Sequence, residues 1–137
     1  MTPPSPGLLA LIALGGGVGA VLRFLVDSAL TARAAAPGSR PFPRGIAVVN
    51  VTGSLLLGLV TGALAGMPGA TDWLSVLGVG VLGGYTTLST ASVDSARLIA
   101  AGSPRAALGN ALGVTLLCVL AAWGGLALGS LFGCGPG

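Results

Sequence analysis

Lysine, glutamate and histidine are all missing from this chain, and charged residues make up only 7% of its 137 positions. A soluble domain carries about 25% charged residues, so this composition excludes an ordinary soluble protein. The three aspartates are scattered along the chain, which leaves general acid–base chemistry few candidates. Six arginines are too few for a nucleic-acid surface. We therefore expect neither an enzyme nor a nucleic-acid-binding protein.

Cysteine is also scarce, and Cys118 and Cys134 have no spacing that forms a redox motif or a metal cluster. Hydrophobic residues, in contrast, make up 53% of the chain. A membrane-spanning helix needs roughly 20 apolar residues, and four such segments run near 8–30, 46–66, 73–99 and 106–132. Turns rich in proline and glycine separate them. We predict an all-α protein of the plasma membrane, with one four-helix transmembrane domain over residues 1–137.

The third segment contains an unusual run, Gly83-Gly84-Tyr85-Thr86-Thr87-Leu88-Ser89-Thr90. Each glycine weakens a helix by roughly 1 kcal/mol relative to alanine, and the hydroxyls that follow offer the backbone non-helical partners. In lipid, a helix break is tolerated only where it is buried in protein or lines a watery cavity. Membrane proteins place ion sites at such breaks. The run therefore predicts a third helix broken near Gly83–Thr87, at an ion site.

Other polar residues lie inside the predicted spans. Asn50 and Ser54 share one helical face, and Asn50 has the groups either to hold a ligand or to join two helices. Arg23 and Asp27 are also four residues apart, which fits either a local ion pair or a cation in a vestibule that attracts anions. Thr115 is expected to bond its own helix. Glycines recur at four-residue spacing in every span, a pattern that predicts close helix packing and favours a dimer interface.

At three of these places the sequence resembles the Fluc (CrcB) family of small fluoride channels. The run Gly-Gly-Gly-Val-Gly-Ala-Val-Leu-Arg-Phe at 15–24 is similar to the family's first helix. The run Val-Asn-Val-Thr-Gly-Ser-Leu-Leu-Leu-Gly at 49–58 is similar to its second helix, and the run at 83–90 is similar to its helix break. The motifs occur in the family's order and cover nearly the whole chain.

The resemblance implies a fluoride-selective channel subunit that lets F⁻ leave the cell passively and so reduces fluoride toxicity in the cytoplasm. It implies an antiparallel dimer of the dual-topology type, with a structural Na⁺ at the dimer interface bound by the backbone carbonyls of Gly83 and Thr86. The anion needs hydrogen-bond donors along its path. By position, the polar residues of that pathway are Arg23, Asn50, Ser54, Thr87, Ser89 and Thr90.

The sequence departs from the family at four pore positions. Leu88 and Ala91 replace phenylalanines of the third helix, whose positive ring edges can face an anion. Asn110 and Val114 fall where the family's fourth helix has a tyrosine and a serine. We therefore expect the pore-degenerate member of a heterodimer. The alternatives are a self-sufficient homodimer, a structural subunit that supports a conducting partner, and a small dual-topology transporter that uses Asp27 to couple protons.

Arginine distribution supports a second, different subunit. The two loops on one side of the predicted spans hold five arginines, whereas the other loop and both termini hold none. This positive-inside bias predicts cytoplasmic arginine loops and two extracytoplasmic termini. An antiparallel homodimer needs chains inserted both ways, so one fixed orientation calls for an oppositely oriented partner. The arginines are Arg33, Arg40 and Arg44 in the first loop, and Arg97 and Arg105 in the third.

The first prediction concerns this orientation. Reporter tags on either terminus should report an extracytoplasmic location in essentially all molecules, because the arginine bias is large. Moving two arginines from the first loop to the C-terminal tail should begin to randomise insertion. A roughly equal mixture of orientations in the unaltered chain would contradict the prediction and favour the homodimer.

Overall fold

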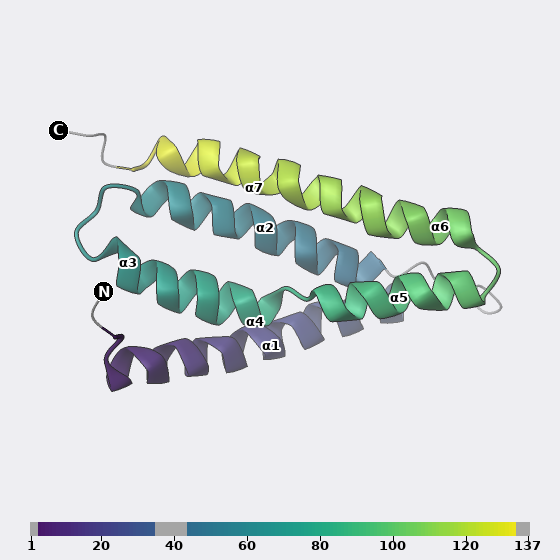
Figure 1. Ribbon diagram of the computed structural model, residues 1–137, viewed down its shortest axis with the longest axis horizontal. Coiled ribbons are helices and arrows are strands. Elements are labelled where there is room, and N and C mark those ends of the chain that lie inside the picture. Colours follow the sequence, from purple (N-terminus) through teal and green to yellow (C-terminus); the bar gives the residue numbers. More distant parts are fainter. Residues whose placement is uncertain (1–2, 35–43, 134–137) are drawn as a thin grey trace.

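The computed structural model describes residues 3–34 and 44–133; Arg40 and Cys134 lie outside this part of the chain (Figure 1). It is helical, with four stretches long and apolar enough to cross a membrane: Pro6–Ala32, Arg44–Leu64, Ala70–Ala100 and Pro104–Ser130. The predicted all-α, four-span architecture is therefore confirmed. The stretches lie side by side, and the start of the first and the end of the fourth are at the same end of the molecule (Figure 1).

Two of the spans are single helices, and two are divided. The first and second are α1 (Pro6–Ala34) and α2 (Arg44–Leu64). The third comprises α3 (Ala70–Leu74), the π-helical segment η1 (Ser75–Leu82), α4 (Gly83–Tyr85) and α5 (Leu88–Ala100). The fourth comprises α6 (Pro104–Leu108), the π-helical segment η2 (Gly109–Gly113) and α7 (Val114–Ser130).

Glycines with positive φ set the ends of two spans. Gly66 (φ 80°) follows α2, which ends at Leu64 rather than at the expected position 66. Gly102 (φ 77°) follows α5, and Pro104 then opens the fourth span, where its missing N–H is not needed. A residue with a side chain rarely adopts this left-handed conformation, so glycine is the natural residue at both turns.

The predicted glycine spacing brings backbones together inside the chain. α2 packs mainly against α7, and Gly58 and Gly62 lie against the carbonyls of Ala122 and Leu126. From the other side, Gly125 lies against the carbonyl of Leu55, so the contact is reciprocal. A Cβ at any of these glycines would fall on backbone atoms of the facing helix. The pattern therefore serves packing within one subunit, as close approach through small residues requires.

α1 makes a similar contact with the third span. Gly19 lies against the carbonyl of Val81, and Gly84 lies against the carbonyl of Gly16. Successive turns of α1 thus meet successive turns of η1 and α4, with both running in the same direction. This contact fixes the end of α4, directly before the break, against α1.

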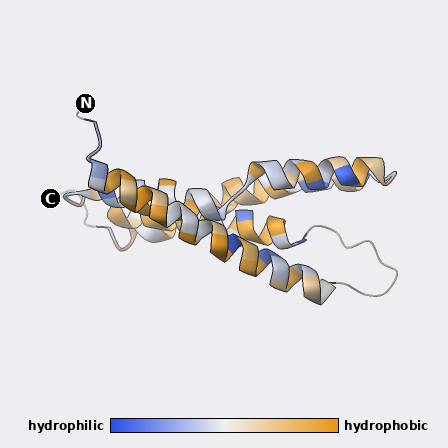
Figure 2. Cartoon of the chain, turned by 90° about the horizontal axis from the view of Figure 1, so that it is seen from below, coloured by the Kyte–Doolittle hydropathy of each residue, from blue (hydrophilic) through white to orange (hydrophobic). Residues whose placement is uncertain are grey.

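α5 is less enclosed. It packs on α6 and η2, and none of its residues is buried. Hydrophobic residues cover most of the helices, and most of the strongly hydrophilic positions lie in the half of the molecule away from the termini (Figure 2). The buried hydrophobic residues nearest this half are Ile46 and Val49 of α2 and Ala107 of α6. α5 therefore extends from the break with little cover from its own chain.

Candidate functional site

The predicted break in the third span is present, and it lies at the two threonines. Thr86 (φ −81°, ψ 157°) and Thr87 (φ −153°, ψ 126°) are extended. The two preceding glycines, Gly83 and Gly84, still form the last helical turn, α4. Gly83 and Gly84 thus weaken the helix, and Gly84 allows α1 to pack closely against it. The change of backbone direction takes place at Thr86 and Thr87.

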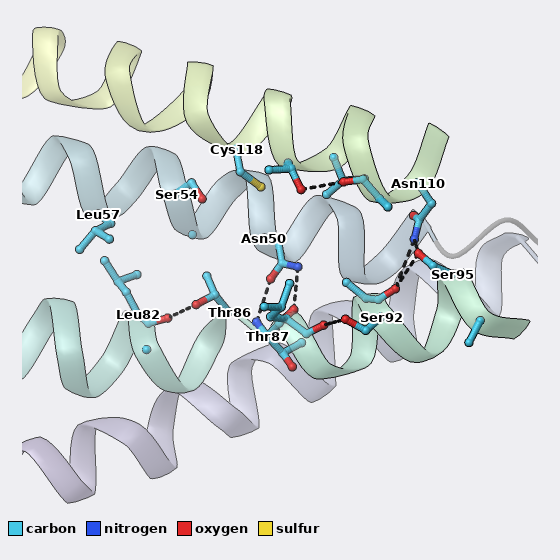
Figure 3. Close-up of a pocket in the computed structure, with 18 of the residues that line it drawn as sticks. Asn50, Ser54, Leu57, Leu82, Thr86, Thr87, Ser92, Ser95, Asn110 and Cys118 are labelled. Carbon is cyan, nitrogen blue, oxygen red and sulfur yellow. Dashed lines mark hydrogen bonds between the residues drawn. The ribbon is translucent and has the colours of Figure 1, made fainter. Parts of the chain in front are cut away.

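Asn50 of α2 holds the extended backbone. Its Nδ2 donates to the carbonyl oxygen of Thr87 (2.8 Å), and its Oδ1 accepts from the amide of Thr87 (2.8 Å). Figure 3 shows both bonds joining α2 to the break. Asn50 is 9% exposed. Of the two roles open to Asn50 in the sequence, joining two helices is therefore realised, because one side chain satisfies both backbone groups of one residue.

The same contact redirects backbone donors. In a continuous helix the amide of Thr87 would donate to the carbonyl of Gly83, four residues earlier, but here it donates to Asn50. The amide of Thr90 would likewise donate to the carbonyl of Thr86, but it donates to Oγ1 of Thr87 (3.4 Å), the N-cap of α5. The carbonyls of Gly83 and Thr86 thus lose their helical donors, as do the other carbonyls at the end of α4.

A hollow of about 710 Å³ lies beside the break, between α2, the third span and the fourth span. It is lined by Gly83 and Thr86, by the predicted pathway residues Asn50, Ser54 and Thr87, and by the four positions that the resemblance marks as departures. Arg23, Ser89 and Thr90 do not line it. Those four positions are Leu88, Ala91, Asn110 and Val114.

Asn110 bonds to α5, a contact that the sequence pattern did not indicate. It is 4% exposed, and its Nδ2 donates to Oγ of Ser95 (2.9 Å) and to the carbonyl of Ala91 (3.4 Å). Figure 3 shows these bonds linking the fourth span to α5. Asn50 and Asn110 are the buried polar side chains of the described chain, and both bind the third span beyond its glycines. α5 is thus attached by amide groups at its start and along its middle.

Arg23 and Asp27 do not pair with each other, although both belong to the described part of α1. The ion pair found among the described residues lies in α5 and joins Asp94 to Arg97 (3.3 Å). Oδ1 of Asp27 lies instead against Gly45, in the first turn of α2, where the helix dipole favours a negative charge. Nε of Arg23 is buried and has no hydrogen-bond partner within the described residues.

Sequence reasoning left four polar residues of the hollow out of the predicted site: Ser92, Ser95, Thr115 and Cys118. Helical spacing could have found them. Positions 88, 91, 92, 95 and 99 fall on one face of α5, and positions 110, 111, 114, 115 and 118 fall on one face of the fourth span. A single face on each helix therefore meets the face of α2 that carries Asn50 and Ser54.

These features define a class of protein: a small multi-pass membrane protein with an interrupted helix beside a largely apolar hollow that several polar side chains line. The chain belongs to the CrcB family, because the model of that family, described as CrcB-like protein, Camphor Resistance, matches residues 10–126. It is a multi-pass membrane protein, as its four spans indicate.

The chain is similar to proteins named as fluoride-specific ion channels, which are not enzymes. It is 44% identical to fluoride-specific ion channel FluC 1 of Leifsonia xyli, over 93% of this chain and 90% of that one. It is 47% identical to FluC 1 of Symbiobacterium thermophilum, over 87% of this chain and 94% of that one. It is also 47% identical to FluC 2 of Cutibacterium acnes, with the same shares covered.

The second prediction concerns Asn50. Asn50→Ala should destabilise the protein by about 1–3 kcal/mol for each group left unpaired, because the amide and carbonyl of Thr87 both lose their partner. Thr61→Ala, also on α2, is the control, since it removes a hydroxyl that bonds only the carbonyl of Leu57 in its own helix. Denaturation of the purified protein in detergent measures both changes. An equal, small effect of both substitutions would contradict the assigned role of Asn50.

Proposed function

We propose that this chain is a subunit of a fluoride-selective channel of the plasma membrane, which exports F⁻ passively and lowers fluoride toxicity in the cytoplasm. The observation that carries the proposal is the interrupted third span held by Asn50 beside the hollow, in a chain whose relatives are named fluoride-specific ion channels. A small, strongly hydrated anion needs polar donors along its path, and Asn50 and Ser54 line the hollow. The proposed activity involves no catalysis.

Arg23 supports the entry of an anion. Its partly buried guanidinium has a nitrogen without a hydrogen-bond partner in the described chain, and it lies one turn beyond Gly19, whose neighbours are Val81 and Tyr85 next to the break. A cation without a partner attracts anions more strongly than one paired with a carboxylate. We assign Arg23 to a vestibule, with Ser89 and Thr90 polar groups of the break that lie outside the hollow.

A structural Na⁺ is part of the proposal, bound by the carbonyls of Gly83 and Thr86. The residues fit this ion, because Asn50 and Thr87 divert the amides that a continuous helix would direct to these carbonyls. Within the described residues no group of three His, Cys, Asp or Glu side chains exists to bind a metal, and the ligands we propose are backbone oxygens. Such an ion would join the breaks of two subunits by neutralising converging carbonyl dipoles.

The partner we propose is a second subunit of the same family in the opposite orientation, with both termini of this chain extracytoplasmic. α5 carries Ser89, Thr90, Ser92, Asp94 and Ser95 but buries none of its residues. Polar residues in a spanning helix are costly in lipid, so this helix needs cover from another protein. The numbered names of the relatives, FluC 1 and FluC 2, fit paired genes.

The alternatives have less support. The transporter requires Asp27 to carry protons through the membrane, whereas its carboxylate lies at the first turn of α2. The homodimer requires insertion in both orientations, against the arginine bias. The purely structural subunit differs from our proposal in one respect: substitution of its own polar residues would have no effect on fluoride flux.

The third prediction concerns flux and the missing aromatic residues. Liposomes that contain this chain alone should show little fluoride efflux, and an oppositely oriented homologue should restore it. Leu88→Phe and Ala91→Phe together test the loss of the ring edges separately. Leu88 is 80% exposed and should accept a larger side chain, whereas Ala91 is half-buried, so Ala91→Phe carries a risk of overpacking. Robust selective efflux from the chain alone would overturn the pore-degenerate assignment.

The fourth prediction concerns the cation. Gly83→Ala should weaken assembly in Na⁺ buffer, because alanine favours a continuous helix by about 1 kcal/mol and returns the amide of Thr87 toward the carbonyl of Gly83. The substitution fits sterically, since the nearest atom to the new Cβ is 3.6 Å away. Gly84→Ala is unsuitable, because its Cβ would fall on the carbonyl of Gly16.

The readout is the dimeric fraction in detergent, measured by light scattering after exchange of Na⁺ for K⁺. The dimeric fraction of the unaltered assembly should fall when K⁺ replaces Na⁺, and that of the Gly83→Ala variant should fall less. If the unaltered assembly is indifferent to the exchange, the cation site is refuted while the channel proposal remains.

A further inference from the structure

Tyr85 is the single tyrosine of the sequence, and it is the last residue of α4, directly before the break. Its phenolic oxygen lies 3.1 Å from Oγ1 of Thr52 on α2. Both side chains are half-buried, and neither lines the hollow. This contact therefore joins α2 to the third span at a place separate from the polar residues of the hollow.

The donor in the bond between Tyr85 and Thr52 follows from the other contacts of Thr52. A threonine hydroxyl has one proton, and Thr52 donates it within α2 to the carbonyl of Val48 (2.8 Å), with the carbonyl of Val49 also close (3.2 Å). Oγ1 of Thr52 then has lone pairs to offer but no further proton. The phenol of Tyr85 is therefore the donor, and its one proton is bound to α2.

Two glycines allow Tyr85 to lie between α1 and α2. A Cβ on Gly53 of α2 would lie 3.1 Å from Cδ1 of the Tyr85 ring and would fall on the methyl group of Thr86. A Cβ on Gly19 of α1 would lie 2.8 Å from the amide nitrogen of Tyr85. Figure 1 shows α4 between these two helices. Tyr85 is thus held by its backbone on one side and by its ring and hydroxyl on the other.

The contact completes a pair of anchors around Thr86. Thr87 is bound to α2 through Asn50, and Tyr85 is bound to α2 through Thr52. Both neighbours of Thr86 are therefore attached to the same helix. Because a planar peptide leaves only two soft dihedral angles per residue, fixing both neighbours restrains the direction of the Thr86 carbonyl.

We propose that Tyr85 is a positioning residue for the structural cation, and that its hydrogen bond to Thr52 holds the Thr86 carbonyl in the direction that binds Na⁺. The inference rests on the proposed cation site and specifies what preorganises it. The phenol does not contact the ion and acts through the backbone of the break. A preorganised ligand binds more tightly because it loses less freedom on binding, so removal of the hydroxyl lowers the affinity for Na⁺.

The test measures the dimeric fraction in detergent as Na⁺ is titrated, with K⁺ keeping the ionic strength constant and the partner subunit unchanged. Tyr85→Phe removes one hydrogen bond and keeps the ring, so it should raise the half-maximal Na⁺ concentration about two- to tenfold. Thr52→Val should raise it at least as much, because the phenol is left unpaired. Thr52→Ser keeps the acceptor and should restore the value of the unaltered assembly. Thr61→Val removes a hydroxyl of α2 that bonds the carbonyl of Leu57 in its own helix, and it should cause no shift.

The double variant Thr52→Val, Tyr85→Phe should need no more Na⁺ than Thr52→Val alone, because both changes break the same bond. At saturating Na⁺ every variant should reach the dimeric fraction of the unaltered assembly and, in liposomes, its fluoride efflux. A merely structural role would instead lower the dimeric fraction at every Na⁺ concentration.

The outcomes separate this inference from the proposals on which it rests. An unchanged half-maximal Na⁺ concentration in Tyr85→Phe, additive shifts in the double variant, or a dimeric fraction that stays low at saturating Na⁺ would overturn the positioning role and leave the channel proposal standing. If the unaltered assembly is indifferent to Na⁺, the cation site and the role of Tyr85 fail together. An assembly that shows the expected shifts but carries no fluoride would refute the channel proposal and support the role of Tyr85.

Discussion

The pair of hydrogen bonds between Asn50 and Thr87 is the interaction on which the rest of the site depends. Two extended residues inside a membrane span expose backbone groups that lipid cannot satisfy. Asn50 satisfies both groups of Thr87 with one planar amide. As a result the third span changes direction at a defined residue, α5 starts at Leu88, and the carbonyls of Gly83 and Thr86 lose their helical donors. The hollow, the proposed cation site and the direction of α5 all follow from this contact.

Much of the fold was predictable because hydropathy and local residue preferences determine it. Four apolar runs predicted four spans, and the glycine and hydroxyl run predicted the break. The position of the change in direction was harder to predict, because it is set by Asn50, 37 residues away from Thr87 in the chain. A contact at that separation depends on how α2 packs against the third span, and a local sequence pattern cannot predict that packing. Sequence alone therefore left ligand binding and helix joining equally open for Asn50.

Predictions about individual polar residues had mixed outcomes for similar reasons. The local bond expected for Thr115 is present, because a threonine in a helix can always reach a carbonyl of its own preceding turn. The local pair considered for Arg23 and Asp27 is not formed within the described residues, and the carboxylate of Asp27 lies instead against the start of α2. Asn110 was assigned from the family pattern as a lost pore position, yet its burial and bonds make it an attachment point for α5.

The glycine contacts of α2 with α7, and of α1 with the third span, have a consequence for how such a sequence can diverge. Both contacts join backbone to backbone, so they depend on the absence of side chains and hardly at all on the identity of the residues around the hollow. The residues at positions 88 and 91 can therefore vary without loss of these contacts. A duplicated copy can drift in its permeation residues over long periods while remaining a well-folded membrane protein, and selection can then act on the two copies as separate, complementary units.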